Sequence, residues 1–144
     1  MIGVSACLCG DNCKYSGGNN LNEEILKLYN EGKALKICPE CLGGLEIPRA
    51  PAELFNCSGS DVLSGTGKVF SKDGKDVTSA FIKGAKEALK IIKENGITTV
   101  ILKSRSPSCG FGKIYNGDFS GTLIDGNGVA AQLFYDNGIE VLQK

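Results

Sequence analysis

The stretch Thr98-Thr99-Val100-Ile101-Leu102 decides the fold class, because it is the clearest strand in the chain. A short unbroken run of β-branched and apolar residues is typical of a strand buried within a parallel sheet. A helix precedes it, beginning at a cap formed by Asp76 or Thr78 and ending at Asn95-Gly96. The apolar face of this helix consists of Phe81, Ala85, Ala88, Leu89 and Ile92.

The N-terminal part of the chain predicts two more strands with a helix between them. Ile2 to Ala6 and Ala34 to Ile37 are short, mostly apolar runs. Between them, Asn20 and Glu23 have the spacing of a helix cap and its partner, and Gly32 ends the helix. The apolar repeat of this helix consists of Leu21, Ile25, Leu28 and Tyr29.

The remaining segments predict two insertions followed by a last helix and strand. Residues 39–74 are irregular and rich in Gly, Ser and Pro, with one strand at Lys68 to Ser71. A later loop contains a small hairpin at Asn116-Gly117. A helix from about 128 to 136 and a strand from Ile139 to Leu142 complete the chain.

This alternation of strands and helices predicts an α/β fold. Strands joined through helices form a parallel sheet with right-handed crossovers, so helices cover its faces. We therefore expect a single three-layer sandwich with a short, mainly parallel sheet of flavodoxin or Rossmann type and with loop or hairpin insertions. No second hydrophobic core is visible, so residues 1–144 are predicted to form a single domain.

The composition excludes several classes of function. With 16 basic and 16 acidic side chains, the chain lacks the positive charge that binding a nucleic-acid polymer requires. The absence of histidine excludes a Ser-His-Asp triad, a Cys-His pair and a His-ligated metal. No apolar stretch approaches the ~20 residues of a membrane span. Seven cysteines, an odd number without a signal peptide before them, indicate a cytoplasmic protein with reduced thiols.

Three of the cysteines follow predicted strands. Cys7 follows the first strand, Cys38 the second, and Cys109 lies in the loop after the strand at 98–102. Ligands of open α/β sheets bind at the carboxyl ends of the strands, so we expect these thiols to meet there. A sulfur-only ligand set suits an iron–sulfur cluster or zinc. A [4Fe–4S] cluster with three protein ligands would leave one iron open to a substrate.

The other cysteines leave alternatives open. Cys38 and Cys41 form a CxxC pair, which also suits a zinc-binding or thiol-redox protein, although no partner CxxC and no evident helix start accompany it. Cys9 or Cys13 is the main candidate for a fourth cluster ligand, and Cys41 is another. Cys57 lies in a Ser/Gly-rich loop and is expected to be inert. A non-catalytic module that carries sulfur or a ligand remains a third class.

The only two arginines, Arg49 and Arg105, lie in loops that leave the same predicted sheet edge. Arginine is suited to fixed planar recognition of a polar ligand. The alternative is that both are ordinary loop arginines bound to backbone carbonyls.

Four groups of residues carry a resemblance to a known family. They are Val4-Ser5-Ala6-Cys7-Leu8 with Gly10 and Cys13-Lys14-Tyr15; Cys38-Pro39-Glu40 with Gly43-Gly44-Leu45 and Pro48-Arg49; Asp76-Val77-Thr78 with Gly84-Ala85; and Lys103 with Ser106-Pro107-Ser108-Cys109-Gly110, Tyr115 and Gly121. In this order they resemble a small bacterial family, formerly a domain of unknown function, whose characterised members are thiouracil desulfidases.

The resemblance implies a [4Fe–4S] cluster held by Cys7, Cys38 and Cys109. It also implies a desulfidase that removes sulfur from a small thiolated base such as 2-thiouracil, giving the oxo base and hydrosulfide. The resemblance also assigns the catalytic roles to Glu40 and Ser106.

Arg49 and Lys103 fall inside the family motifs and are assigned to substrate binding. Without the resemblance, the sequence favours a structural interpretation of Glu40 and Ser106. Glu40 is then a helix cap or surface carboxylate, and Ser106 forms a turn before Pro107.

Overall fold

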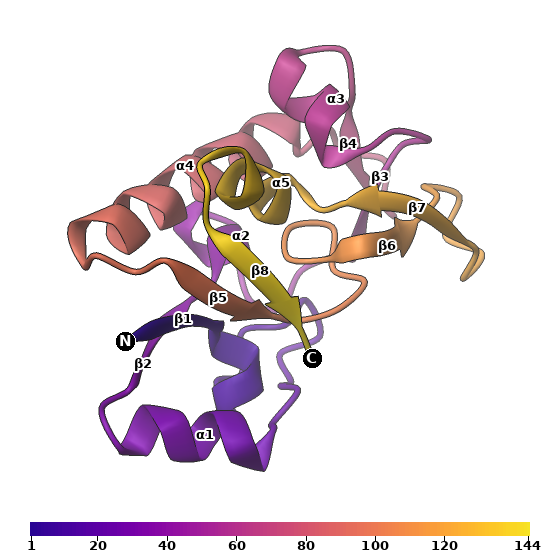
Figure 1. Ribbon diagram of the computed structural model, residues 1–144. Coiled ribbons are helices and arrows are strands. Elements are labelled where there is room, and N and C mark those ends of the chain that lie inside the picture. The colour runs from indigo at the N-terminus through magenta and orange to yellow at the C-terminus, as the bar shows by residue number, and fades with distance from the viewer.

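A four-stranded parallel sheet forms the centre of the computed structural model, which describes residues 1–144 (Figure 1). Its strands are β1 (Ile2–Ser5), β2 (Ala34–Ile37), β5 (Thr99–Leu102) and β8 (Glu140–Gln143), in the order β2-β1-β5-β8. Every neighbouring pair is parallel, with Val4 opposite Lys36 and Val100 opposite Val141 in register.

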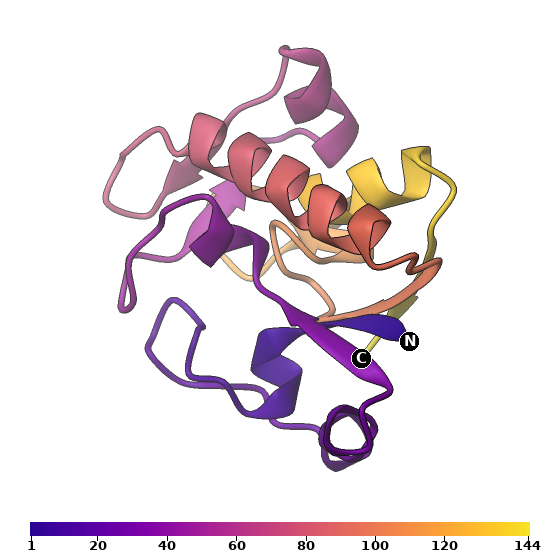
Figure 2. The same ribbon diagram turned by 90° about the vertical axis from the view of Figure 1, so that its left-hand side faces the viewer.

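Helices cover both faces of the sheet, as Figure 2 shows from the side. Helix α1 (Glu23–Asn30) lies on one face, and α4 (Thr78–Glu94) and α5 (Val129–Asp136) lie on the other. The larger core, of 18 buried residues, includes the inner sides of α4 and α5, whereas a cluster of five buried residues lies under α1. The predicted α/β sandwich with a short parallel sheet is therefore confirmed. None of the helices combines the length and hydrophobicity needed to cross a membrane.

The two strands that neighbour β1, β2 and β5, lie on opposite sides of it. The crossover through α1 places β2 on one side of β1, and the crossover through α4 places β5 on the opposite side. The connections at the carboxyl ends of β1 and β5 therefore diverge, which opens the crevice where α/β sheets bind ligands.

Two predicted helix starts need correction or refinement. Helix α1 is capped by Asn22, whose side-chain oxygen accepts the N–H groups of Glu24 (3.1 Å) and Ile25 (3.2 Å). The predicted cap, Asn20, is wrong, because its backbone N–H bonds to the carbonyl of Cys7 and its amide lies 3.5 Å from the Cys7 thiol.

At α4, both of the proposed capping residues contribute to the helix start. Neither is the N-cap residue, which is Val77, but Asp76 Oδ1, one position earlier, accepts the N–H of Thr78 at 2.9 Å. Thr78 is the first helical residue, and its hydroxyl accepts the N–H of Val69 at 2.9 Å. The hydroxyl of Thr78 therefore ties α4 to the strand that precedes it.

The insertions contain more structure than the sequence predicts. The predicted strand near 68–71 is β4 (Val69–Ser71), and it pairs with an unpredicted strand, β3 (Ala52–Leu54). The predicted hairpin consists of β6 (Phe111–Tyr115) and β7 (Leu123–Asn127). The other unpredicted elements are the 3-10 helix η1 (Ala6–Cys9), α2 (Pro39–Leu42) and α3 (Gly59–Ser64). These short elements carry too few residues for a periodic pattern.

Helix α2 and helix α4 touch through their backbones. A Cβ atom at Gly84 of α4 would stand 1.8 Å from the carbonyl oxygen of Pro39, and one at Gly43 would stand 2.1 Å from that of Ala80. Glycine is therefore required at both positions. This contact fixes the place of α2, which begins next to Cys38 and contains Glu40.

Replacing Gly84 by Ala tests this contact. We expect Gly84→Ala to lower the free energy of unfolding by about 1–3 kcal/mol through overpacking, although Ala is the better helix former. Urea denaturation measures the change, and Glu87→Ala on the exposed face of α4 is the control. Unchanged or increased stability in Gly84→Ala would contradict the close contact.

Candidate functional site

A cavity of about 530 Å³ opens at the carboxyl ends of β1, β2 and β5. Its size is typical of a small-molecule site. All of the site residues predicted from the sequence line it, namely Cys7, Cys38, Cys109, Glu40, Ser106, Arg49 and Lys103. The sheet topology therefore brings together residues that are far apart in the chain.

Each predicted thiol reaches the cavity from a different strand. Cys7 lies in η1 directly after β1, and Cys38 directly follows β2 as the N-cap residue of α2. Cys109 lies in the loop after β5 and is only 5% exposed. A helix does begin at the CxxC pair, so the expectation of none there is wrong. Pro39 occupies its first turn, where a missing N–H costs no hydrogen bond.

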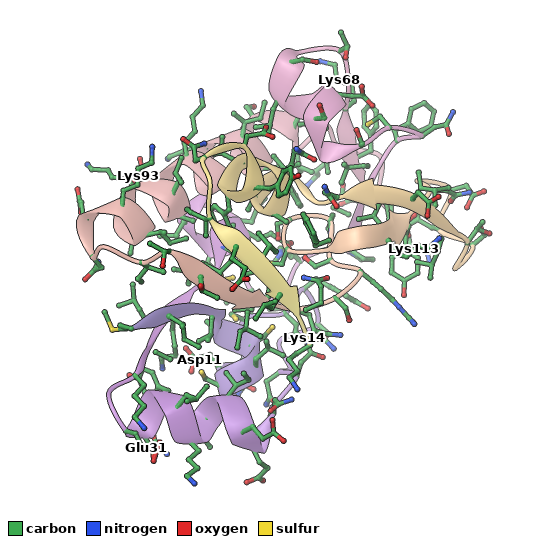
Figure 3. All side chains as sticks on the ribbon, viewed as in Figure 1. Asp11, Lys14, Glu31, Lys68, Lys93 and Lys113 are labelled. Atoms are coloured by element: carbon green, nitrogen blue, oxygen red, sulfur yellow. The ribbon has the colours of Figure 1, made fainter.

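Cys13 is the one further thiol that lines the cavity. It belongs to the loop between η1 and α1, which Lys14 marks in Figure 3. Hydrogen bonding from Cys13 lowers the pKa of Cys7 to about 7 and that of Cys38 to about 6. Burial raises the pKa of Cys109 to about 12.

The remaining cysteines lie away from the cavity. Cys9 is buried in the small cluster under α1, and Cys41 and Cys57 are half-buried thiols outside the cavity lining. Burial is the largest cause that raises the pKa of Cys41, to about 11. Of the proposed candidates for a fourth ligand, Cys13 alone faces the same space as the three predicted ligands.

The donor set fits an iron–sulfur cluster better than a zinc ion. Soft thiols from three separate segments face one cavity, and no three His, Cys, Asp or Glu side chains converge as ligands of a single metal ion. A zinc ion needs all of its thiolates at about 2.3 Å from one point. A cluster takes one thiolate at each of its irons and so accepts more widely spaced ligands.

The carboxylate of Glu40 is held at both oxygens. Ser108 Oγ donates to Oε2 at 3.0 Å, and Arg49 Nη2 donates to Oε1 at 3.2 Å. The Glu40 side chain is 16% exposed, so these bonds act in a partly desolvated place. The carboxylate is therefore not a mobile surface group, and its position beside the thiols is set by two partners.

The guanidinium of Arg49 forms its hydrogen bonds with other groups of the protein. Besides Glu40, its Nη2 donates to the carbonyl of Cys13 at 3.0 Å, and its Nη1 donates to the carbonyl of Glu46 at 3.0 Å. Its Nε is buried without a partner. Arg49 thus connects α2 with the loop that carries Cys13. Arg105, the other arginine, also lines the cavity and has a left-handed backbone with φ of 65°.

Ser106 shapes the loop that carries Cys109. Its hydroxyl oxygen accepts the N–H groups of Ser108 (3.2 Å) and Cys109 (3.0 Å), which is the turn expected of a serine before Pro107. It also lies 3.1 Å from the hydroxyl of Ser108. A chain of hydroxyls therefore runs from Ser106 through Ser108 to Glu40.

Ser108 is the site residue that the sequence reasoning missed. It is 2% exposed and contacts Glu40 directly, whereas Ser106 reaches Glu40 only through it. Its place beside Cys109, in the same motif as Ser106, was the available signal.

Lys103 is anchored by its backbone, with its side chain toward the cavity. Its N–H donates to the buried hydroxyl of Ser5 at 2.9 Å, which links β5 to the end of β1. Its Nζ lies 3.3 Å from Ser104 Oγ, and its charge lowers the pKa of Cys7 slightly, after several larger causes. The ammonium group therefore adds a positive charge near the thiols.

Comparison with known proteins identifies relatives over the whole chain. The model of a family described as 2-thiouracil desulfurase matches residues 2–144. A Bacillus subtilis (strain 168) protein, the uncharacterized protein YbbK, is 48% identical over 144 residues, which covers 100% of this chain and 95% of that protein. The solved structure of the [4Fe-4S]-dependent thiouracil desulfidase TudS is similar with a TM-score of 0.87 and 40% identity, covering 100% of this chain and 90% of that one.

Removing the guanidinium of Arg49 tests whether it fixes the site. We expect Arg49→Ala to lower the free energy of unfolding by about 3 kcal/mol, because it leaves the partly buried Glu40 carboxylate without its cation. Arg49→Lys should recover only part of this loss, since one ammonium cannot replace the planar fork. Urea denaturation is the measurement. Lys33→Ala, which removes an exposed ion pair with Glu31, is the control and should change stability by less than ~1 kcal/mol. Equal effects of Arg49→Ala and Lys33→Ala would contradict this role.

Proposed function

The chain belongs to the 2-thiouracil desulfurase family, and from this we propose that it removes sulfur from a small thiolated base such as 2-thiouracil. The products are the oxo base and hydrosulfide, with water supplying the oxygen. The cofactor is a [4Fe–4S] cluster, which agrees with the [4Fe-4S] dependence stated for TudS. We assign its ligation to Cys7, Cys38 and Cys109.

One observation carries this proposal: three thiols and a fixed carboxylate share one cavity at the sheet edge. The thiols supply soft ligands, and the carboxylate supplies a group that moves protons. A non-catalytic carrier of sulfur needs the thiols but has no use for a carboxylate held on both oxygens. The cavity also has space for a small heterocycle beside the thiols.

When bound, a cluster with three protein thiolates offers an open iron that attracts a soft thiocarbonyl sulfur and polarises the C=S bond. Glu40 is placed to accept a proton from water or to give one to a ring nitrogen. Ser108 and Arg49 hold its carboxylate in place, and Ser106 extends this chain of hydroxyls to the loop of Cys109.

We assign substrate binding to Lys103 and Arg49, two of the cationic side chains that line the cavity. The Lys103 ammonium is free to hold a ring oxygen, since its side chain is bound only to Ser104. Both terminal nitrogens of Arg49 are bonded to protein groups, so Arg49 can meet a substrate only through the planar face of its guanidinium. We place the protein in the cytoplasm, where its seven free cysteines stay reduced, and treat residues 1–144 as a single desulfidase domain.

The thiol-redox alternative depends on Cys38, whose lowered pKa and place at the start of α2 resemble a reactive CxxC thiol. It predicts a colourless protein that exchanges disulfides through Cys38 and Cys41. The desulfidase proposal predicts a brown, anaerobically purified protein that contains iron and sulfide. Metal analysis combined with a thiouracil turnover assay separates the two.

Loss of any one ligand should prevent cluster binding. We expect Cys7→Ser, Cys38→Ser and Cys109→Ser each to lose most of the iron and the absorption near 400 nm, because each removes one iron–thiolate bond. Cys57→Ser is the matched control and should keep both. Full iron content in Cys109→Ser would remove that residue from the site. Iron loss in Cys13→Ala would show a fourth protein ligand and would contradict an open iron.

Neutralising Glu40 should slow the reaction without removing the cluster. We expect Glu40→Gln to lower kcat on 2-thiouracil by about 10²–10⁴-fold, since a placed proton-transfer group contributes that much. Iron content should stay at the level of the unmodified protein, because Glu40 is assigned to the substrate. The exposed Glu87→Gln serves as the control. Normal turnover in an iron-replete Glu40→Gln protein would exclude this role.

A further inference from the structure

The tip of the β6–β7 hairpin, residues 116–122, reaches the same cavity as the thiols. Phe119 and Gly121 line the cavity, although both belong to an insertion outside the central sheet. Phe119 is partly buried, whereas its neighbours Asp118 and Ser120 are exposed. A single aromatic side chain on this loop thus turns inward, toward the space left for a substrate.

The carboxylate of Glu53 holds this loop. Glu53 lies on β3, and its Oε1 accepts the N–H of Gly117 at 2.9 Å and that of Phe119 at 3.3 Å. Glu53 forms no ion pair, so these amides are its hydrogen-bonding partners. A charged acceptor makes each such bond stronger than one between neutral groups.

The backbone of the loop shows that its position is imposed. Phe119 has φ of 57°, a left-handed conformation that bulky side chains rarely adopt. A Cβ at Gly117 would stand 2.5 Å from the carbonyl oxygen of Leu54, so the loop presses directly on β3. The N–H of Asn56 also bonds to the carbonyl of Asn116 at 2.9 Å. Such strain persists only where surrounding contacts enforce it, and it is common at binding sites.

We propose that Phe119 is a specificity-determining wall of the substrate cavity and that Glu53 is the positioning residue that holds it there. An aromatic face suits a flat heterocycle, and a fixed face favours planar rings over flexible thioamides of equal size. This inference rests on the proposed desulfidase function. It concerns recognition and leaves the proton transfer to Glu40.

The two hydrogen bonds from Gly117 and Phe119 to Glu53, which we call the clamp, are tested by hydrogen exchange of the anaerobic holoenzyme. Exchange is read by mass spectrometry on peptides covering 116–122. In Glu53→Ala we expect exchange at Gly117 and Phe119 to accelerate on the order of tenfold or more, because two bonds to a charged acceptor are lost. Glu53→Gln keeps an oxygen acceptor in the same place and should retain most of the protection. Asp125→Ala is the matched control, since it removes an exposed carboxylate of the same hairpin that is paired with Lys113. Figure 3 labels Lys113 on this hairpin.

Kinetics with 2-thiouracil and an acyclic thiourea, N-alkylated so that it is flexible and of similar size, test the wall. We expect Glu53→Ala and Phe119→Ala to raise KM for 2-thiouracil about threefold to tenfold, with kcat nearly unchanged and with normal iron content. KM for the thiourea should not change, and Phe119→Tyr and Glu53→Gln should restore the KM for 2-thiouracil. The double variant should be no worse than the more impaired single variant, because both changes act through one side chain.

Two results would overturn the proposal. Unchanged exchange in Glu53→Ala would show that the carboxylate does not hold the loop. Faster exchange without a change in the KM for 2-thiouracil would show that the loop is held but does not select the substrate. Absence of turnover by the unmodified, iron-replete protein would instead refute the proposed function, while the exchange data would still report on the clamp.

Discussion

The hydrogen-bonded carboxylate of Glu40 is the contact on which the site depends. It joins α2, through its own backbone, to the loop of Cys109 through Ser108 and to the loop of Cys13 through Arg49. These segments hold three of the four cavity thiols, Cys13, Cys38 and Cys109, so one carboxylate helps to set their spacing beyond the ends of the strands. The fixed spacing matters because a placed proton-transfer group works only within hydrogen-bond reach of the reacting atoms.

The surrounding protein balances the cost of placing this charge away from water. A partly buried carboxylate is tolerated only when it is paired and hydrogen-bonded. Arg49 supplies the opposite charge, and the backbone carbonyls of Cys13 and Glu46 satisfy further guanidinium donors. Gly84 of α4 also packs directly against the carbonyl of Pro39 in α2, so α2 cannot shift without breaking the contact between the two helices. Folding and site geometry therefore depend on the same few atoms.

A second carboxylate that lines the cavity, Glu53, also holds a distant loop. Both Glu40 and Glu53 accept hydrogen bonds from a loop that is far away in sequence, the loop after β5 for Glu40 and the loop between β6 and β7 for Glu53. Glu40 faces an arginine, whereas Glu53 faces only backbone N–H groups. Glu40 is therefore held together with the loops of the thiols, whereas Glu53 anchors the loop that carries Phe119.

Local sequence patterns determined the strands of the central sheet and the longer helices between them. The runs at 2–6, 34–37 and 98–102 could be recognised because apolar and β-branched residues stand together, and the structure has strands at 2–5, 34–37 and 99–102. The parallel order then predicted that Cys7, Cys38 and Cys109 meet. The motif around Ser106 and Cys109 also marked the loop that the structure brings to Glu40.

Tertiary structure alone decided the contacts that carry no periodicity. The sequence reasoning chose Asn20 rather than Asn22 as the cap of α1, because the hydrogen bonds that Asn20 makes with Cys7 are not visible in a linear spacing. It missed Ser108, α2 and the approach of Phe119 to the cavity for a related reason. A four-residue helix has too few positions to show a period, and the bonds from Ser108 to Glu40 and from Glu53 to Gly117 span 68 and 64 residues of chain. Only folding brings such partners within about 3 Å, and no local pattern along the chain marks which distant residues will meet.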